Sequence, residues 1–511
     1  MSERVPPVFV GQGRVSIEDI VRVARGEARV EVDPDEEVRR RIAASAKMVE
    51  DALLQRRSIY GITTGFGASV EFAVSPEVAA QMPLNLLRYH GCGTGAKLSP
   101  EAAAAVVAVR LASLTRGYSG VRMEVINRLA ELLERRVLPV IPEEGSVGAS
   151  GDLTPLSYVA AMVVGEREVY FEGGIQPAEA VLAKLGLAPI SLRPKESLAI
   201  LNGTSVMTAL GCLAWERAQR LGRFSSLLTA MASEVLSGVP GHFDDRIFAA
   251  KPHPGQRAAA RWIREALSPT AEEPARLQDR YSLRCAPHVI GVLLDALPFA
   301  RTLLETEANG VNDNPLLDPE ADEALHGGNF YGGHACLATD TLKNVVANVA
   351  DLLDRQLVLL NNPMMNAGLP ANLVARTGPD RTTHHGFKAM EITASALTAE
   401  ALKLTMPSSV FSRSTESHNQ DKVSMGTISA REAMRILDLT ETVAVVHLLA
   451  VCQAVDIRGP ERTGERAQAM RDAVRTAVPE NRADRRMDGD IEVALRLYRS
   501  HGLPLGGIDF P

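Results

Sequence analysis

The chain is poor in cysteine, and its thiols are not spaced as disulfide or metal pairs. Scattered single thiols are typical of a reducing compartment and speak against a disulfide framework or a zinc site. An HExxH motif is also absent, and the adjacent His384 and His385 diverge on a helix, so we expect no metal site. The five cysteines are Cys92, Cys212, Cys285, Cys336 and Cys452.

The sequence also lacks a long uninterrupted apolar run. A membrane span needs about 20 apolar residues. The most apolar segment, 443–455, contains His447 and Gln453 and is typical of a buried core helix. The first ten residues, MSERVPPVFV, are charged and interrupted by proline, unlike a secretory signal. We therefore expect a cytoplasmic protein with no membrane partner.

Positive charge is not in excess. The chain has 55 Lys and Arg against 62 Asp and Glu, a net charge of -7. A nucleic-acid partner would require a clustered basic face, so we expect none. The hydrophobic share of 46% and the charged share of 23% are those of a soluble globular protein.

Aromatic residues make up only 4% of the chain, so its core must consist mainly of Ala, Leu and Val. That composition suits closely packed helices. Ser75-Pro76-Glu77 and Ser99-Pro100-Glu101 each predict a helix start, with a cap, a proline and an acid. In the segment 339–360 the apolar residues follow a period near 3.6, which predicts a helix. The segments 205–238, 386–406 and 428–456 are long and mostly apolar, and helices that are apolar on nearly all sides favour a large bundle.

Glycine-rich loops interrupt the helical pattern, mostly in the first part of the chain. Such loops let the backbone approach a ligand closely. We predict a loop-rich domain at 1–200 and a helical-bundle domain at 201–511. The loops are at 61–68, 91–95, 145–151, 202–204 and 326–333.

The segment Gly145 to Leu156 carries the most distinctive chemistry. In Ala149-Ser150-Gly151 the Gly151 amide nitrogen can attack the Ala149 carbonyl carbon, with loss of water. Loss of the Ser150 hydroxyl then leaves a methylene conjugated to an imidazolone, which is an electrophile. Taken alone, the tripeptide would be interpreted as a turn. It is not the GxSxG nucleophile elbow, and no phosphate-binding glycine motif surrounds it.

Several motifs, in one order along the chain, change that interpretation. They are Tyr60-Gly-Ile-Thr-Thr-Gly-Phe-Gly67, Gly145 to Leu156, Leu201-Asn202-Gly203-Thr204, Gln278-Asp-Arg-Tyr281-Ser-Leu-Arg284-Cys285, Asn312-Asp-Asn314-Pro315, His326-Gly-Gly-Asn-Phe330, and Asn419-Gln420-Asp421 followed by Val423-Ser424-Met425-Gly426. With these motifs the chain resembles, from about residue 10 to about residue 460, the family of histidine, phenylalanine and tyrosine ammonia-lyases, whose prosthetic group is 4-methylidene-imidazole-5-one (MIO).

The resemblance implies the catalytic roles. MIO would form autocatalytically from Ala149-Ser150-Gly151, and Tyr60 would remove the β-proton from a loop that can act as a lid. A free phenol has a pKa near 10, so Tyr60 requires surroundings that lower its pKa. Tyr281 is expected to complete the catalytic set.

The resemblance also implies a substrate-binding set. Arg284 would anchor the substrate carboxylate, because its planar fork matches a carboxylate bidentately. The other members would orient the substrate and the MIO oxygen, pack beside the ring or line the amine end: Asn202, Gln278, Asn314, Phe330, Glu416 and Gln420.

The pair Tyr89-His90 is expected to face the substrate side chain. Tyr-His resembles some bacterial tyrosine lyases, and an imidazole can bond to a phenol hydroxyl. Gln420 resembles the phenylalanine and tyrosine lyases, whereas the run from Tyr281 to Cys285 resembles the histidine lyases. The leading prediction is L-tyrosine to p-coumarate, with possible activity on L-phenylalanine.

Three alternatives remain open at this stage. One is a histidine ammonia-lyase that forms urocanate. Another is a tyrosine or phenylalanine 2,3-aminomutase, which returns the amine to the β-carbon. The third, an inactive scaffold, predicts a broken catalytic motif, and none is broken.

The resemblance implies a fold and an assembly as well. The expected fold is mainly α, with a long central helical bundle of the ammonia-lyase and fumarase type. The loop-rich N-terminal domain would bear MIO. The expected assembly is a homotetramer whose sites combine residues from several subunits.

Overall fold

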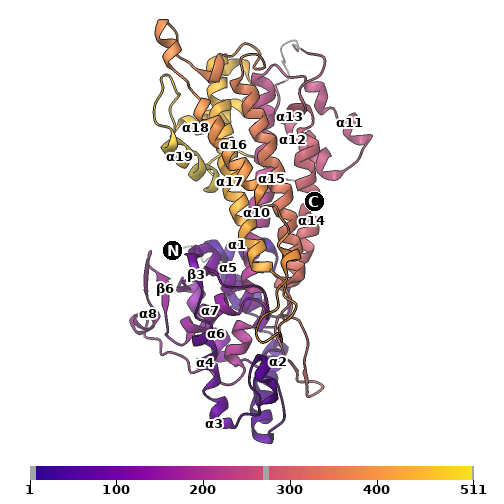
Figure 1. The fold of residues 1–511 in the computed structure, drawn as a ribbon, viewed down its shortest axis with the longest axis vertical. Helices are drawn as coiled ribbons and strands as arrows, with labels where there is room; N and C mark the ends of the chain where they lie inside the picture. The colour runs from indigo at the N-terminus through magenta and orange to yellow at the C-terminus, as the bar shows by residue number, and fades with distance from the viewer. Residues whose placement is uncertain (1–6, 269–275, 509–511) are drawn as a thin grey trace. The chain divides into compact units, whose positions relative to one another are not determined.

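The computed structural model describes residues 7–268 and 276–508, and helices dominate both units into which they divide. This confirms the predicted mainly α fold (Figure 1). The first unit comprises Met1–Glu216, Ala300–Asp340 and Pro407–Arg431, and the second comprises Arg217–Phe299, Thr341–Met406 and Glu432–Pro511. The first unit thus continues past residue 200 and takes in two later segments that the division at 200 does not include.

The helix starts follow the local sequence. Ser16 forms a capping box with Asp19, and Gly26 ends the same helix in a left-handed conformation. Ser75 and Ser99 each accept a backbone N–H from the first turn of their helices, with proline at the start, as predicted. These ends are set by chemistry within a few residues, which is why the sequence predicts them well.

The first unit consists of short helices with small sheets between them. Its helices are α1 (Ile17–Arg25), α2 (Glu36–Gln55), α3 (Pro76–Ala79), α4 (Met82–Tyr89), α5 (Pro100–Leu114), α6 (Met123–Glu134), α7 (Leu153–Val163), α8 (Ala178–Lys184) and α9 (Glu196–Leu201), with the 3-10 helices η1 (Gly67–Glu71) and η5 (Ser408–Phe411). Helix α5 is buried along nearly its whole length, and the contacts among α4, α7 and α9 bring three predicted site segments together.

Four small sheets lie in the first unit. Strands β1 (Pro7–Val10) and β2 (Arg29–Val32) pair in parallel with Val8 opposite Val30, and β3 (Thr94–Lys97) pairs antiparallel with β5 (Pro142–Glu144). The other two sheets are antiparallel and comprise β4 (Leu138–Pro139), β6 (Glu168–Phe171) and β7 (Gly174–Pro177), and β8 (Leu316–Asp318) with β9 (Glu323–Leu325).

Four long helices contribute residues to both units: α10 (Ser205–Val235), α14 (Ala286–Ala308), α15 (Gly333–Asn361) and α17 (Gly426–Arg458). Within the second unit they run alongside one another (Figure 1), and Arg217 of α10 bonds to Glu441 and Asp438 of α17. Gln356 of α15 donates to Thr229 of α10 at 2.9 Å. The predicted helical bundle is therefore confirmed.

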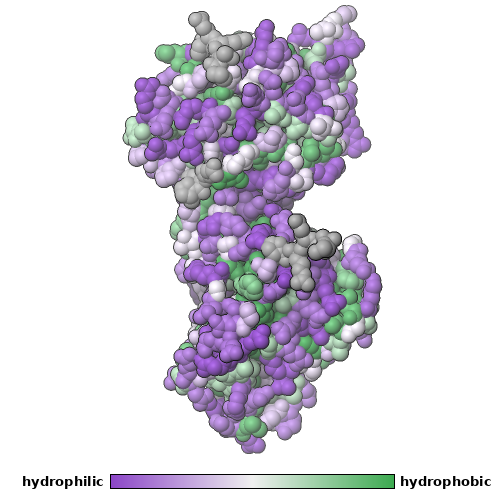
Figure 2. All heavy atoms as spheres, turned by 180° about the vertical axis from the view of Figure 1, so that it is seen from behind, coloured by the Kyte–Doolittle hydropathy of each residue, from purple (hydrophilic) through white to green (hydrophobic). Residues whose placement is uncertain are grey.

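Shorter helices complete the second unit. They are α11 (Asp245–Ala249), α12 (Pro254–Ala266), α13 (Tyr281–Arg284), α16 (Lys388–Lys403), α18 (Glu465–Arg475) and α19 (Asp488–Arg499), with η2 (Pro240–Phe243), η3 (Ala371–Leu373), η4 (Pro379–Thr383) and η6 (Pro460–Arg462). The face shown in Figure 2 is mostly hydrophilic, with smaller hydrophobic areas between.

Two stretches, Tyr281–Ala308 and Gly426–Arg458, are long and apolar enough to cross a membrane by length and composition alone. The apolar window of Gly426–Arg458 is 89% buried inside the protein, and that of Tyr281–Ala308 is 50% buried. Burial of this kind is what the core helices of a helical bundle require.

Candidate functional site

The first unit contains a cavity of about 860 Å³ where the predicted site segments meet. Its lining comes from the 60–74 loop, α4, the loop before α7, the end of α9, and the 314–330 and 416–422 segments. Ten of the predicted site residues line it: Tyr60, Tyr89, His90, Ala149, Ser150, Asn202, Asn314, Phe330, Glu416 and Gln420.

The tripeptide that would form the prosthetic group lies directly before α7. Gly151 has φ of 71°, and its backbone forms a parallel bridge with Gly203. A Cβ at position 151 would overlap the Gly203 carbonyl, so only glycine fits this approach. The amide that would attack Ala149 is therefore unhindered and held in a fixed bend.

Asp152 anchors the end of this tripeptide. Its Oδ2 accepts the backbone N–H groups of Val206 and Met207, at 2.9 and 3.0 Å, in the first turn of α10. Its Oδ1 accepts hydroxyl hydrogens from Thr427 and Ser146. Burial raises the pKa of Asp152 to about 6, although all four hydrogen bonds favour the charged form.

This raised pKa predicts a measurable pH dependence of stability. Asp152 has a folded pKa of about 6 against an unfolded value of 3.8, so its contribution is favourable when protonated and is lost as pH rises through 6. Asp152→Asn cannot ionise. As pH rises from about 4 to about 7, we expect the wild-type free energy of unfolding to fall relative to the variant by up to about 3 kcal/mol. Denaturant unfolding at several pH values measures this, and parallel curves would contradict it.

A network of buried polar side chains surrounds Asn202. The Asn202 amide donates to Asp313 Oδ1 at 3.1 Å and to the Asn314 carbonyl at 2.9 Å. Asp313 forms a completely buried ion pair of 2.5 Å with Lys195. Arg110, also fully buried, donates to the carbonyls of Asn202 and Asn312. These bonds hold Asn202 in one orientation, with its Oδ1 buried and without a partner among the described residues.

Tyr60 lies at the cavity, in the loop that the sequence predicts as a lid. Its phenol oxygen accepts the Gly67 N–H at 2.8 Å, and its own N–H points to His326 Nε2 at 3.4 Å. Burial raises the pKa of Tyr60, the Gly67 bond lowers it, and the charge of Glu416 raises it, for a net increase. The first unit therefore does not supply the pKa-lowering surroundings that a phenol base requires.

Glu416 and Gln420 belong to one short turn that touches both the lid and the tripeptide. The Glu416 carboxylate accepts the Ala68 N–H at 2.9 and 3.1 Å, next to the Tyr60 loop. Gln420 Nε2 donates to Ser150 Oγ at 3.2 Å. Thr415 and Gln420 form an isolated antiparallel bridge that fixes the turn.

Helix α4 carries the two residues expected to meet the substrate side chain. Tyr89 ends the helix and His90 caps it, with ring centroids 4.6 Å apart. Burial, and then the charge of Arg167, lower the pKa of His90 to about 4, while burial raises the pKa of Tyr89 to about 12. Both side chains are therefore uncharged at neutral pH.

The cavity also involves residues that the sequence analysis missed. Met82, Asn85 and Leu86 line it from α4, one or two turns before Tyr89. Helical spacing from Tyr89 back along the predicted helix would have placed them on its face. Leu198 and Lys422 also line the cavity, each a few residues from a quoted motif.

Three predicted residues, Gln278, Tyr281 and Arg284, belong to the second unit and are not among those lining this cavity. The Tyr281 side chain is 73% exposed, and the Arg284 guanidinium lies over its ring, 4.6 Å from the centroid. Arg284 Nε donates to the Asp279 carbonyl at 3.0 Å. This pair is thus presented on the surface of its own unit.

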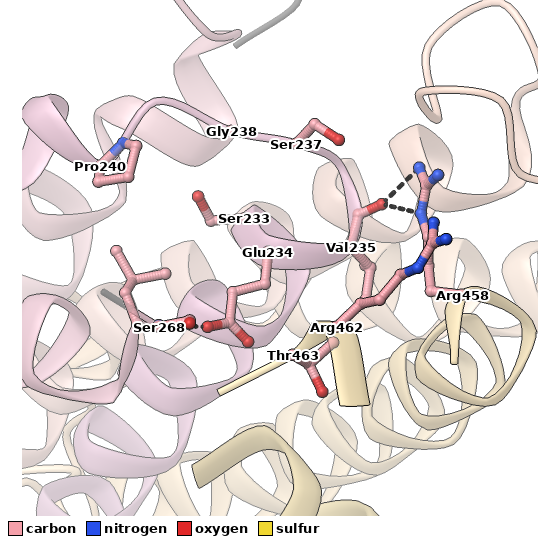
Figure 3. A pocket seen from close by; sticks show the side chains of 11 residues that line it. Ser233, Glu234, Val235, Ser237, Gly238, Pro240, Ser268, Arg458, Arg462 and Thr463 are labelled. Atoms are coloured by element: carbon pink, nitrogen blue, oxygen red, sulfur yellow. Dashed lines mark hydrogen bonds between the residues drawn. The ribbon is translucent and has the colours of Figure 1, made fainter. Parts of the chain in front are cut away.

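The second unit has a much smaller cavity, of about 40 Å³, at the end of α10. Figure 3 shows Arg458 directed at the Val235 carbonyl, to which it donates two hydrogen bonds. Glu234 accepts the backbone N–H groups of Ser268 and Gly464. Arg458 and Glu234 of this small cavity therefore bind the backbone at the ends of helices. Within 7–268 and 276–508, no three His, Cys, Asp or Glu side chains gather as a metal site.

Comparisons with known proteins identify the family of the chain. Residues 15–476 match the family model described as aromatic amino acid lyase. The chain belongs to that family. This places it in the ammonia-lyase family, among the carbon–nitrogen lyases.

Curated relatives cover almost the whole chain. The chain is 38% identical over 490 residues to the histidine ammonia-lyase of Symbiobacterium thermophilum, covering 95% of each protein. It is 37% identical to human histidine ammonia-lyase, covering 95% of this chain and 74% of the human protein.

Solved structures are similar along the full length. Tyrosine aminomutase from Streptomyces globisporus has a TM-score of 0.89 at 36% identity and 98% coverage of both chains. Histidine ammonia-lyase from Trypanosoma cruzi has a TM-score of 0.88 at 31% identity, covering 99% of this chain and 98% of that one. The helical-bundle fold of the ammonia-lyases is thereby confirmed.

The prediction of tyrosine or phenylalanine as the lyase substrate is wrong by these comparisons, because the curated relatives are named histidine ammonia-lyases. The physical reason lies in His90 and Gln420. An uncharged imidazole and an amide each donate and accept hydrogen bonds, so they suit an imidazole side chain as well as a phenol. The run from Tyr281 to Cys285, which resembles the histidine lyases, was the better indicator.

Proposed function

We propose that the protein eliminates ammonia from L-histidine to form urocanate, with an MIO group made from its own Ala149-Ser150-Gly151. The observation that carries this proposal is the single cavity that brings Ser150 together with Tyr60 and His90. The names of the curated relatives support histidine as the substrate.

The residues around the tripeptide fit an MIO group. Gly151 has the bend and the bare Cα that ring closure needs, and the Gln420 amide already lies 3.2 Å from Ser150 Oγ. The buried Asn202 Oδ1 has no partner among the residues described and lines the same cavity. Once formed, the group supplies an electrophile for the substrate amine, which no ordinary side chain provides.

The side chains of this chain divide the remaining work. Tyr60 removes the β-proton, and Gln420 and Glu416 orient the amine. An ammonium group beside Glu416 would offset the negative charge that raises the pKa of Tyr60. His90, uncharged, hydrogen-bonds the imidazole of the substrate, and Phe330 packs beside its ring.

The carboxylate end of the substrate suits a planar arginine fork, and none of the described residues that line the cavity is an arginine. We assign it to Arg284, with Tyr281 and Gln278, from a neighbouring subunit, and to Asn314 of the same cavity. This assignment fits a homotetramer. Large apolar side chains on α14 and α16 support such an assembly, because they are exposed in the single chain: Val292, Phe299, Ile392 and Leu402.

The other assignments are those of a small-molecule enzyme. Scattered thiols and a net charge of -7 support a cytoplasmic enzyme that binds neither nucleic acid nor a membrane. We assign no metal to the reaction, because the electrophile is built from the chain itself.

A second candidate function is a 2,3-aminomutase. The similarity to the tyrosine aminomutase of Streptomyces globisporus along 98% of both chains favours it. In such a reaction the amine is returned to the β-carbon before the acrylate leaves. The lid around Tyr60 and Glu416 is where the residence time of the acrylate would be set.

Product analysis separates these functions. Purified enzyme should be incubated separately with histidine, tyrosine and phenylalanine, while urocanate, the other acrylates and β-amino acids are all measured. We expect urocanate from histidine as the main product. A β-amino acid as the main product would establish the mutase instead, and inactivity on histidine would refute the first proposal.

A further inference from the structure

The turn that follows α7 contains an arginine in an unfavourable backbone conformation. Arg167 has φ of 64°, a left-handed conformation that disfavours residues with a Cβ. An outlier of this kind is kept where the surrounding contacts require its side chain. The side-chain contacts of Arg167 are with the end of α4 and with Ser157 and Tyr158 of α7.

The Arg167 guanidinium binds the last turn of α4. Nη2 donates a short hydrogen bond to the Leu87 carbonyl, which is one of the carbonyls left open at a helix C-terminus. The guanidinium also lies over the Tyr158 ring of α7, 4.3 Å from the centroid. A cation at this place is favoured by the helix dipole as well.

The hydroxyl of Ser157 connects the guanidinium with the backbone of His90. Nη1 donates to the hydroxyl of Ser157 at 2.9 Å. That hydroxyl lies 3.2 Å from the His90 carbonyl and 2.7 Å from the Thr154 carbonyl. Ser157 is completely buried on α7, the helix that begins directly after the MIO tripeptide.

Gly91 leaves the space that this arrangement needs. A Cβ at position 91 would overlap Nη2 of Arg167. The residue after His90 therefore has to be glycine for the guanidinium to reach the Leu87 carbonyl.

We propose that Arg167 is a positioning residue that fixes the end of α4, and with it the place of His90, and so determines how the substrate side chain is recognised. The proposal rests on the proposed contact between His90 and that side chain. It adds a residue that does not line the cavity and acts through the end of α4, which carries His90.

The charges around His90 support this role. Arg167 is the charged group whose field lowers the pKa of His90, after burial. On its own helix, His90 contacts the uncharged Tyr89. Glu416 from the 415–420 turn and Tyr60 from the lid act on Tyr89. A protonated His90 could no longer accept a hydrogen bond from the substrate side chain.

Arg167→Gly is the sharpest test, because glycine relieves the backbone conformation while it removes the guanidinium. We expect KM for histidine to rise by about tenfold or more, with kcat changed much less, because the lost contacts act on side-chain binding. The pKa of His90, followed by NMR of histidines labelled at Cε1 and assigned with His90→Gln, should rise, because the charge of Arg167 lowers it in addition to burial, which remains.

Two further variants separate charge from geometry. Arg167→Lys keeps the charge without the planar fork, so the pKa of His90 should stay low while KM recovers only in part. Arg88→Gln is the matched control: it breaks the exposed 2.6 Å ion pair between Arg88 and Glu166 on the same turn, and should leave KM and the His90 pKa nearly unchanged.

The outcomes are distinct for the two proposals. If Arg167→Gly leaves both the pKa of His90 and KM unchanged, or if Arg88→Gln has an equal effect, the role of Arg167 is refuted. If the pKa rises but KM for histidine does not, Arg167 does control His90. In that case, the proposed contact between His90 and the substrate side chain is refuted.

Discussion

Ser150→Ala is expected to lower kcat by at least about a thousandfold while leaving the fold unchanged. Ser150 supplies the hydroxyl whose loss creates the methylene of the prosthetic group, and alanine has no leaving group. Ser150 Oγ accepts one hydrogen bond, from Gln420, so its removal costs little stability. Steady-state turnover of histidine measures the effect.

A matched control is Ser191→Ala, at an exposed serine of the same unit that does not line the cavity. It should retain wild-type turnover, and both variants should melt within a few degrees of the wild type. Turnover by Ser150→Ala within tenfold of the wild-type rate would refute an electrophile at this position.

Tyr60→Phe is expected to lower kcat by roughly 10²- to 10⁴-fold, the usual contribution of a positioned acid or base. The tripeptide is untouched, so the prosthetic group should still form. The variant loses the bond from the Gly67 N–H to the phenol oxygen, which holds the lid loop as well as the base.

The dependence of kcat/KM on pH tests the same role of Tyr60, because kcat/KM should rise with pH only while the phenol is present. A base acts only when deprotonated, and burial raises the pKa of Tyr60 above its usual value of 10. The wild-type kcat/KM should therefore rise with pH across the neutral range, and the Tyr60→Phe profile should lose that rise. The control is Tyr170→Phe, which removes a phenol bonded to the Leu98 carbonyl outside the cavity. An unchanged slope in Tyr60→Phe would assign the base elsewhere.

The parts of the molecule that local chemistry determines could be predicted from the sequence. Ser16, Ser75 and Ser99 cap their helices through bonds that span only three residues. Ordered motifs predicted most of the cavity lining because each motif occupies a separate loop. Ala149-Ser150-Gly151 can be recognised only together with the other motifs, since the tripeptide alone would be interpreted as an ordinary turn.

The remainder depends on contacts between distant segments. The pKa of His90 depends on Arg167, and the pKa of Tyr60 depends on burial and on Glu416. The sequence shows that a phenol base needs surroundings that lower its pKa. It does not show that the surroundings within the first unit raise the pKa of Tyr60 instead. The return of 300–340 and 407–431 to the first unit is likewise a matter of tertiary packing.

The quoted motifs disagree on the choice between histidine and tyrosine, because the run from Tyr281 to Cys285 resembles the histidine lyases while Gln420 resembles the phenylalanine and tyrosine lyases. Tyr89, His90 and Gln420 line the cavity, but the two rings are uncharged there, and an imidazole or an amide suits either substrate. Specificity then depends on distances that only a bound side chain would fix. Arg167 and Ser157, which lie next to the backbone of His90 and not at the cavity, affect such distances through His90.

The most direct test of the account is the intact mass of the purified chain, followed by the mass of the peptide that contains residues 145–156. The account predicts that the wild-type peptide is lighter than its sequence by two water molecules, and that Ser150→Ala cannot lose the second of them. A wild-type peptide with the full sequence mass, isolated from enzyme that turns over histidine, would contradict an electrophile built from Ala149-Ser150-Gly151.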